Sequence, residues 1–189
     1  LAVAGETASV SYERMCEEQE VYDEEEKDFY QRREATWKSL VMHPDRVQKV
    51  VRHMVKHFLE HPDPNGFKAQ FVAIDRMACV EYKKAIDAEF VRVGRPDATA
   101  WSDVVISAAQ NDPPELETYH YSKDKTDNLI AWFKLTPAKW GVENIKRHGD
   151  DRARWRPPLK ILIVCDRLLT GFDAPIEQVM YLDKPLRDH

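Results

Sequence analysis

The sequence predicts an α/β fold, a parallel sheet with helices on both faces that is preceded by a helical segment. Short continuous apolar runs recur from residue 69 onward and alternate with segments of helical periodicity. This alternation is typical of a parallel sheet that is buried on both faces. The chain has 189 residues, of which 43% are hydrophobic and 32% charged, and this balance favours a folded domain over a disordered chain.

The first 66 residues are predicted to form a helical lead-in with an acidic beginning. Residues 1–36 carry 11 acidic and four basic side chains, whereas the rest of the chain carries 22 acidic and 24 basic ones. Apolar residues are too sparse before residue 40 to form a core. We therefore expect an exposed helix there, or one that packs on another part of a longer protein.

An amphipathic helix is predicted from Asp45 to Glu60, where apolar residues recur three and four positions apart. Pro44 suits the first turn of this helix, and the run HPDPNG that begins at His61 ends it. The main domain is then expected to cover residues 67–189.

Four short apolar runs are the expected strands of this domain: Ala69–Ile74, Val104–Ser107, Lys160–Cys165 and Val179–Leu182. Helical spacing between Ala78 and Phe90 and around Thr126–Leu135 predicts the covering helices. Trp132 and Phe133 are expected to cover the sheet rather than to stack on bases. The stretch Thr136–Pro158 is predicted to be a polar insertion.

Composition excludes several classes of protein. No apolar run approaches the roughly 20 residues of a membrane helix, and we expect no signal peptide, because no charged region followed by an apolar one stands after Leu1. The first residue is not Met, so we expect a piece of a longer protein. Cys16, Cys79 and Cys165 are odd in number and widely spaced, which excludes a disulfide scaffold and a cysteine-based zinc site and fits a reducing cytoplasm.

The segment KILIVCDRLLTGFDAP, from Lys160 to Pro175, is the strongest candidate for a binding site. An apolar strand runs into a turn, and ligands bind at the carboxyl ends of strands in parallel sheets. In that turn Thr170 could donate to a phosphate, Gly171 would allow close backbone approach, and Asp173 could accept from a ribose hydroxyl. By spacing alone, an ordinary glycine turn followed by a helix cap is the simpler interpretation.

The order of several motifs gives this segment more weight. LLTGFDAP, the preceding ILIVCD and the following YLDKPLRDH resemble motif V and the next strand of the motor subunit of type I restriction-modification enzymes. Those enzymes belong to the superfamily 2 helicases and translocases. KAQFVAIDRMACVEYKKAID, from Lys68 to Asp87, resembles the motif IV strand and helix of that family. The resemblance covers residues 67–189 and implies the second RecA-like lobe.

The resemblance also implies roles for particular residues. Gly171 and Asp173 become candidate nucleotide contacts. The candidate DNA contacts lie in and near motif V and at the end of the motif IV strand: Thr170, Asp166, Arg167, Asp75 and Arg76. Arg76 suits a phosphate, because phosphate contacts supply most non-specific affinity for DNA. Cys165 stands where many superfamily 2 proteins have a Thr just before the Asp of this strand, so a hydroxyl-to-phosphate contact is not expected there.

The implied parent is an ATP-dependent, DNA-translocating and DNA-cleaving enzyme that uses ATP and Mg²⁺. Its implied partners are double-stranded DNA and the methylation and specificity subunits, with no membrane. The chain contains no GxxxxGK[ST] loop, and the arginine-bearing motif VI would lie beyond His189. We therefore expect the chain alone to bind no cofactor and to be inactive. The alternative is a non-enzymatic RecA-like module for DNA binding or partner docking.

Three other patterns suggest chemistry but favour ordinary structural roles. Asp63 with the Glu81–Lys83 triplet formally matches a PD…ExK nuclease site, although the triplet lies in a helical period. His53, His57 and His61 have a spacing that could bind a metal from one helix face. We expect instead that they lie exposed or at the boundary of the buried stripe, without a metal. The DEEE run from Asp23 lacks a preceding apolar strand and therefore indicates a solvated charge run.

Overall fold

A computed structural model describes residues 24–165, 168 and 172–184. The chain divides into two compact units, Leu1–Val47 and Gln48–His189. In the first unit, helix α2 (Glu24–Val41) exposes the described apolar side chains Phe29 and Leu40. The acidic region thus contains a helix, as predicted, and whether it packs on another part of a longer protein stays a prediction. Helix α3 (Pro44–Glu60) begins at the predicted proline, and the residues of its apolar stripe that belong to the second unit include the buried Val51, Met54 and Phe58.

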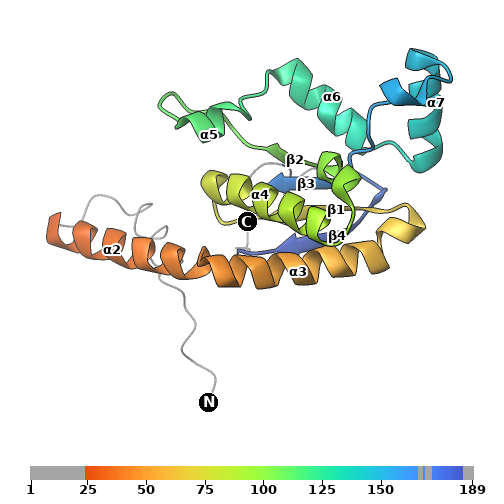
Figure 1. The fold of residues 1–189 in the computed structure, drawn as a ribbon. Helices are drawn as coiled ribbons and strands as arrows, with labels where there is room; N and C mark the ends of the chain where they lie inside the picture. Colours follow the sequence, from red (N-terminus) through yellow and green to blue (C-terminus); the bar gives the residue numbers. More distant parts are fainter. Residues whose placement is uncertain (1–23, 166–167, 169–171, 185–189) are drawn as a thin grey trace. The chain divides into compact units, whose positions relative to one another are not determined.

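The second unit contains a four-stranded sheet in the order β2-β3-β1-β4, and all its paired strands are parallel (Figure 1). The strands are β1 (Lys68–Val72), β2 (Ser102–Val105), β3 (Ile161–Val164) and β4 (Glu177–Leu182). Each one overlaps a predicted apolar run. The predicted α/β class is thus confirmed, and the sheet is consistent with a RecA-like lobe.

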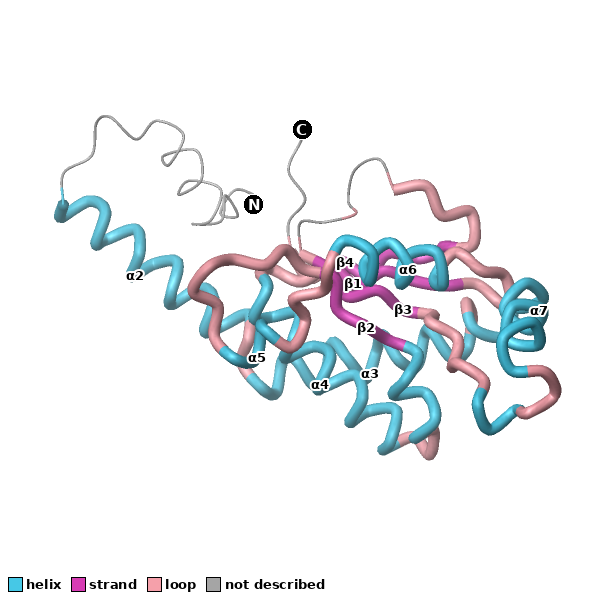
Figure 2. The backbone as a smooth tube through the Cα atoms, turned by 90° about the horizontal axis from the view of Figure 1, so that it is seen from above, coloured by secondary structure: helices cyan, strands magenta, loops and turns pink. Residues whose placement is uncertain are grey.

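Helices cover both faces of this sheet, as Figure 2 shows. On one face lie α3 and α4 (Arg76–Arg92), where the Phe71 and Tyr82 rings pack with centroids 4.4 Å apart. On the other face lies α6 (Lys123–Phe133), whose buried residues Trp132 and Phe133 join the cluster around Val72. Trp132 and Phe133 therefore cover the sheet as predicted.

The connections contain several short elements. They are η1 (Asp63–Asn65), η2 (Pro96–Trp101), α5 (Pro114–Glu117), α7 (Pro137–His148) and η3 (Arg152–Arg154). Helix α7 lies inside the stretch that was predicted to be a polar insertion. Thr136 begins it, because its hydroxyl accepts a hydrogen bond from the Lys139 amide at 3.4 Å. The proposed domain boundary at residue 67 stays a prediction.

Side chains along β1 point alternately to the two faces of the sheet, and this alternation decides which of them lie on the face that α6 covers. Ala69 and Phe71 face α3 and α4, whereas Lys68, Gln70 and Val72 point toward α6. A parallel strand that is covered on both faces normally carries only apolar residues. Lys68 and Gln70 are 4% and 0% exposed, so this face holds two buried polar groups.

Candidate functional site

The carboxyl ends of the strands lie at one edge of the sheet, and the predicted motif IV residues follow β1 there. The Asp75 carboxylate accepts a hydrogen bond from the Ala78 amide at 2.7 Å and so caps α4. Arg76 is the first residue of α4, and its guanidinium donates to the Ser107 carbonyl at 3.0 Å. Asp75 and Arg76 therefore follow the end of β1 at this edge, and their predicted DNA contacts stay predictions.

Arg76 also pairs with a carboxylate that sequence reasoning did not single out. Its Nη1 lies 2.5 Å from Asp112 Oδ2, in the loop between β2 and α5. The same carboxylate oxygen lies 2.8 Å from His120 Nε2 and 2.9 Å from the Ala109 amide nitrogen. These contacts tie the loop after β2 to the start of α4. They orient Arg76, whose side chain remains 31% exposed.

The environment of Asp112 keeps this carboxylate ionised. Burial opposes the charged form, but hydrogen bonds from Ala109, Arg76 and His120 together lower the pKa of Asp112. A carboxylate that stays charged keeps the Arg76 guanidinium in place across the physiological pH range. Arg76 is therefore a fixed and partly exposed cation at this edge, and such a guanidinium can contact a phosphate oxygen.

The end of β4 reaches the same edge. The Asp183 amide donates to the Val72 carbonyl at 2.9 Å, and the Asp183 carboxylate accepts from the Tyr82 hydroxyl of α4. Both side chains are buried. This bond fixes the end of β4 to the helix that carries Arg76 at its first position.

The motif V residues are placed only in part. Asp166, Arg167, Thr170 and Gly171 lie outside the described residues, so their predicted roles stay predictions. Leu168 is described, and it has a left-handed φ of 65°, which is rare for a leucine. Its carbonyl lies 3.5 Å from Gln70 Nε2, so Leu168 lies on the α6 face of the sheet.

Asp173 follows a residue that is anchored on the same face. The Phe172 ring lies 6.1 Å from the Phe133 ring, whereas Asp173 is exposed. Its neighbour Ala174 accepts a hydrogen bond from the Glu177 amide at the start of β4. Asp173 therefore lies on the segment that returns to β4. No described contact joins it to Arg76 or Asp112, and its predicted nucleotide role stays a prediction.

The residues of the PD…ExK pattern and of the histidine pattern make contacts in different parts of the structure. Asp63 pairs with Lys160 at 2.6 Å, whereas Lys83, within α4, pairs with Asp87 at 2.5 Å. The PD…ExK pattern therefore does not converge on one site. His57 Nδ1 lies 2.8 Å from the Tyr181 hydroxyl oxygen. Within the described residues, no three His, Cys, Asp or Glu side chains are grouped so that they could hold a metal ion.

The last three residues of the DEEE run, Glu24–Glu26, are the first residues of α2, whereas Asp23 lies outside the described residues. No helix in the described ranges is long and apolar enough to cross a membrane.

Two basic features escaped the sequence analysis. Lys68 Nζ is buried against the last turn of α6, where it donates to the Phe133 carbonyl at 2.5 Å. Arg147 and Arg156 gather over the Trp132 ring beside a cavity of about 390 Å³. The capping pattern Thr136-Pro137 was the available signal for α7, which carries Arg147.

Comparison with known proteins gives a family match over most of the second unit. The sequence pattern described as "Type I restriction enzyme subunit R domain 3" matches residues 65–189. This range contains every described strand, together with all the candidate site residues.

Full-length relatives match over a similar span. The chain is 33% identical to the MjaVIIP type I restriction enzyme endonuclease subunit of Methanocaldococcus jannaschii over 156 residues, which cover 80% of this chain and 13% of that protein. It is 32% identical to the MjaVIIIP subunit of the same organism over 145 residues, 76% of this chain and 13% of that protein. It is 29% identical to the HindI endonuclease subunit of Haemophilus influenzae over 146 residues, 77% of this chain and 12% of that protein.

Proposed function

Because the chain belongs to the type I restriction enzyme subunit R domain 3-like family, we propose that it is the second RecA-like lobe of an ATP-dependent DNA translocase. The chain spans about 13% of the length of the relatives it matches, so the activity of the whole subunit is part of this proposal. The parent would translocate and cleave double-stranded DNA in a complex with methylation and specificity subunits, in the cytoplasm.

The observation that carries the proposal is the cation fixed at the carboxyl edge of the sheet. Arg76 is held by Asp112 and by the Ser107 carbonyl, and part of its side chain remains exposed. Ligands of open parallel sheets bind at this edge. A guanidinium that is oriented in advance loses little entropy when it contacts a phosphate, so Arg76 suits the DNA backbone.

We also propose that ATP and Mg²⁺ bind between this lobe and the other RecA-like lobe of the intact subunit. The exposed carboxylate of Asp173 fits a ribose hydroxyl, and Gly171 precedes it by two positions. The chain has no GxxxxGK[ST] loop, and its described residues have no cluster of metal ligands. This lobe would therefore contact the nucleotide without holding its Mg²⁺, and we expect no ATP hydrolysis by the chain alone. Mg²⁺-dependent ATP turnover by the purified chain would contradict this expectation.

The test uses Asp173→Ala in the intact subunit, assembled with its partner subunits. We expect ATP-coupled translocation to be abolished while the thermal unfolding midpoint stays unchanged, because the Asp173 side chain is exposed and has no described partner. Asp127→Ala is the matched control, since Asp127 is also an exposed aspartate without a described side-chain contact. Translocation by Asp173→Ala at the rate of the control would refute the nucleotide role of Asp173.

A further inference from the structure

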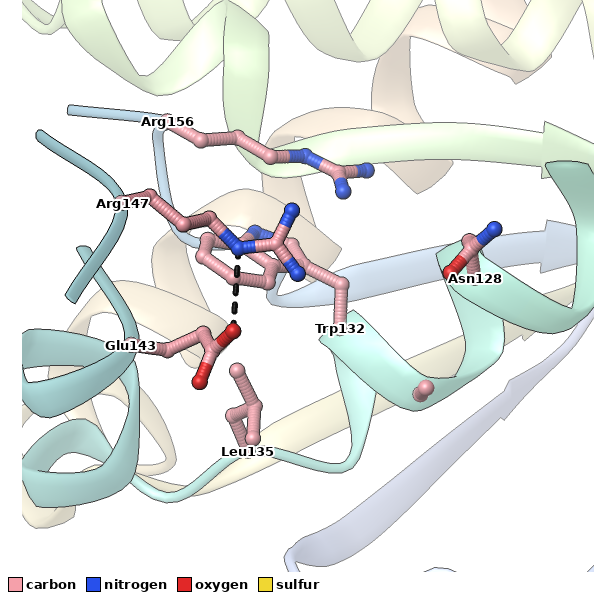
Figure 3. A pocket seen from close by; sticks show the side chains of 7 residues that line it. Asn128, Trp132, Leu135, Glu143, Arg147 and Arg156 are labelled. Atoms are coloured by element: carbon pink, nitrogen blue, oxygen red, sulfur yellow. Dashed lines mark hydrogen bonds and ion pairs between the residues drawn. The ribbon is translucent and has the colours of Figure 1, made fainter. Parts of the chain in front are cut away.

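A cavity of about 390 Å³ lies between α6 and the segment that follows it, away from the carboxyl edge (Figure 3). Trp132 and Asn128 line it from α6, and Arg147, Glu143 and Arg156 line it from α7 and the segment after α7. The Trp132 indole nitrogen donates to the Pro157 carbonyl at 2.8 Å, just before β3. The cavity therefore borders the amino-terminal end of the sheet.

Both arginines are positioned against one immobile ring. The guanidinium carbons of Arg156 and Arg147 lie 4.7 Å and 5.9 Å from the centroid of the Trp132 ring. Trp132 is 4% exposed, and its hydrogen bond to Pro157 fixes the ring plane. An aromatic face attracts a guanidinium and restricts its rotamers without using its N–H donors. The two cations are thus oriented before any ligand arrives.

Most of the donors of these arginines remain available. Glu143 Oε1 accepts from Arg147 Nε at 3.0 Å, and this bond leaves both terminal amino groups of Arg147 for a ligand. The Arg156 guanidinium has no hydrogen-bond acceptor within the part of the chain that the structure describes. Burial and the nearby charge of Arg147 lower the pKa of Arg156, and Asp103 opposes this shift. A bound anion would offset the repulsion between the two cations.

The surrounding charge favours a polyanion. The stretch from residue 136 to residue 158 contains six Lys and Arg and three Asp and Glu side chains, so its net charge is positive although the whole chain is acidic. A local basic field of this kind steers nucleic acid toward a surface. Two guanidiniums beside one cavity suit the several oxygens of a phosphate, which accepts from forked donors.

We propose that Arg147 and Arg156, held over Trp132, bind a backbone phosphate of duplex DNA. The choice of DNA rests on the proposed function, but the site is separate from the carboxyl edge. It gives the lobe a second DNA contact, from the α6–α7 side.

The test measures the affinity of the chain for a short fluorescein-labelled DNA duplex by fluorescence anisotropy at several salt concentrations. We expect Arg147→Gln and Arg156→Gln each to weaken binding about tenfold, the loss typical of one charge-assisted contact. The slope of log affinity against log salt should fall by about 0.9 for the lost phosphate contact. Arg154→Gln is the matched control, because Arg154 is exposed outside the cavity and pairs with Asp151 at 3.6 Å. It should change binding far less.

Two further variants separate recognition from folding. Arg156→Lys keeps the charge but loses the forked donors, so it should bind more weakly than the wild type while unfolding at the same temperature. Glu143→Gln removes the negative charge from the cavity and should tighten DNA binding. Inorganic phosphate should shift the arginine side-chain resonances of the wild-type chain in NMR spectra, and a glutamate peptide at equal charge should compete less well than DNA.

Three results would overturn the inference. They are absence of DNA binding by the wild-type chain, equal losses for the cavity variants and Arg154→Gln, and preferential binding of the glutamate peptide. The second result leaves the proposed function intact, because the carboxyl edge would still bind DNA. Conversely, the inference is supported if the cavity variants bind DNA more weakly while Asp173→Ala translocates normally. Only the proposed nucleotide role of Asp173 is then refuted.

Discussion

The buried ammonium group of Lys68 gives this lobe a pH-dependent stability that the substitution Lys68→Met should remove. The side chain is 4% exposed in the first position of the central strand β1. Its Nζ donates to the carbonyls of Phe133 and Trp132, at 2.5 Å and 3.5 Å, at the last turn of α6. These acceptors lie at the negative end of the helix dipole and partly compensate the burial.

The expected magnitude follows from the pKa of Lys68. Burial, assisted by the charge of Lys160, lowers this pKa from 10.5 to about 8. Between these two values the unfolded chain binds a proton at Lys68 and the native chain does not. The free energy of unfolding therefore rises as the pH increases from 8 to 10.5. One pKa unit corresponds to about 1.4 kcal/mol, so the rise attributable to Lys68 is at most about 3 kcal/mol.

Urea unfolding, followed by circular dichroism at a series of pH values, measures this contribution as a difference between proteins. We expect the stability of the wild type to rise relative to that of Lys68→Met above pH 8, whatever their order at pH 7. Lys139→Met is the matched control, since Lys139 is exposed and should follow the wild-type profile. Parallel pH profiles for the wild type and Lys68→Met would refute the reasoning, because they would show that Lys68 titrates as in the unfolded chain.

Two further predictions concern positions around the start of the sheet. Gly66 has a φ of 75°, and a Cβ there would lie 2.9 Å from Pro137 Cγ. Gly66→Ala should therefore lower the free energy of unfolding by about 1 kcal/mol or more in urea unfolding. Gly94→Ala is the control, because Gly94 has a similar positive φ but open space around it, and it should lower the stability less. Burial raises the pKa of Glu177 from 4.5 to about 7, so the native state holds the extra proton and stability should fall by at most about 3 kcal/mol as the pH rises between these values. Glu177→Gln should flatten this part of the pH profile, and an unchanged slope would contradict the assignment.

Much of the fold could be predicted because its strands are short, apolar and continuous. Lys160–Cys165 and Val179–Leu182 were predicted to be strands from their continuous apolar residues, and they overlap β3 and β4. Helix α6 begins three residues earlier than predicted, because Ser122 caps it by accepting from the Lys125 amide. Such a cap adds polar residues to a helix without extending its apolar stripe, so periodicity does not detect it.

Helix α7 was missed because the whole stretch Thr136–Pro158 was interpreted as a polar insertion. Val142 and Ile145 are about half exposed, and Asn144 is the buried residue of this helix. The Asn144 side chain bonds the backbone of Arg156, and Trp140 adds a hydrogen bond to the Arg156 carbonyl and a ring contact with Trp155, so these contacts link α7 to the segment after it. Ala138, Val142 and Ile145 nevertheless recur at helical spacing, so periodicity and the Thr136-Pro137 cap together were sufficient to predict this helix.

The candidate site was predictable in its position but not in its contacts. Loops after parallel strands meet at one edge, so the neighbourhood of Asp75 and Arg76 followed from the fold class. Asp112, by contrast, lies 36 residues from Arg76 in a loop, and only the tertiary structure pairs them. The same is true of Lys68, whose burial depends on where the last turn of α6 lies.

A structure of the intact subunit, determined by cryo-electron microscopy with duplex DNA and a non-hydrolysable ATP analogue, would test the central claim most directly. We predict that both ligands lie at the carboxyl ends of β1 to β4, with Arg76 at a DNA phosphate and Asp173 at the ribose. A structure in which another domain covers this edge and excludes both ligands would contradict it.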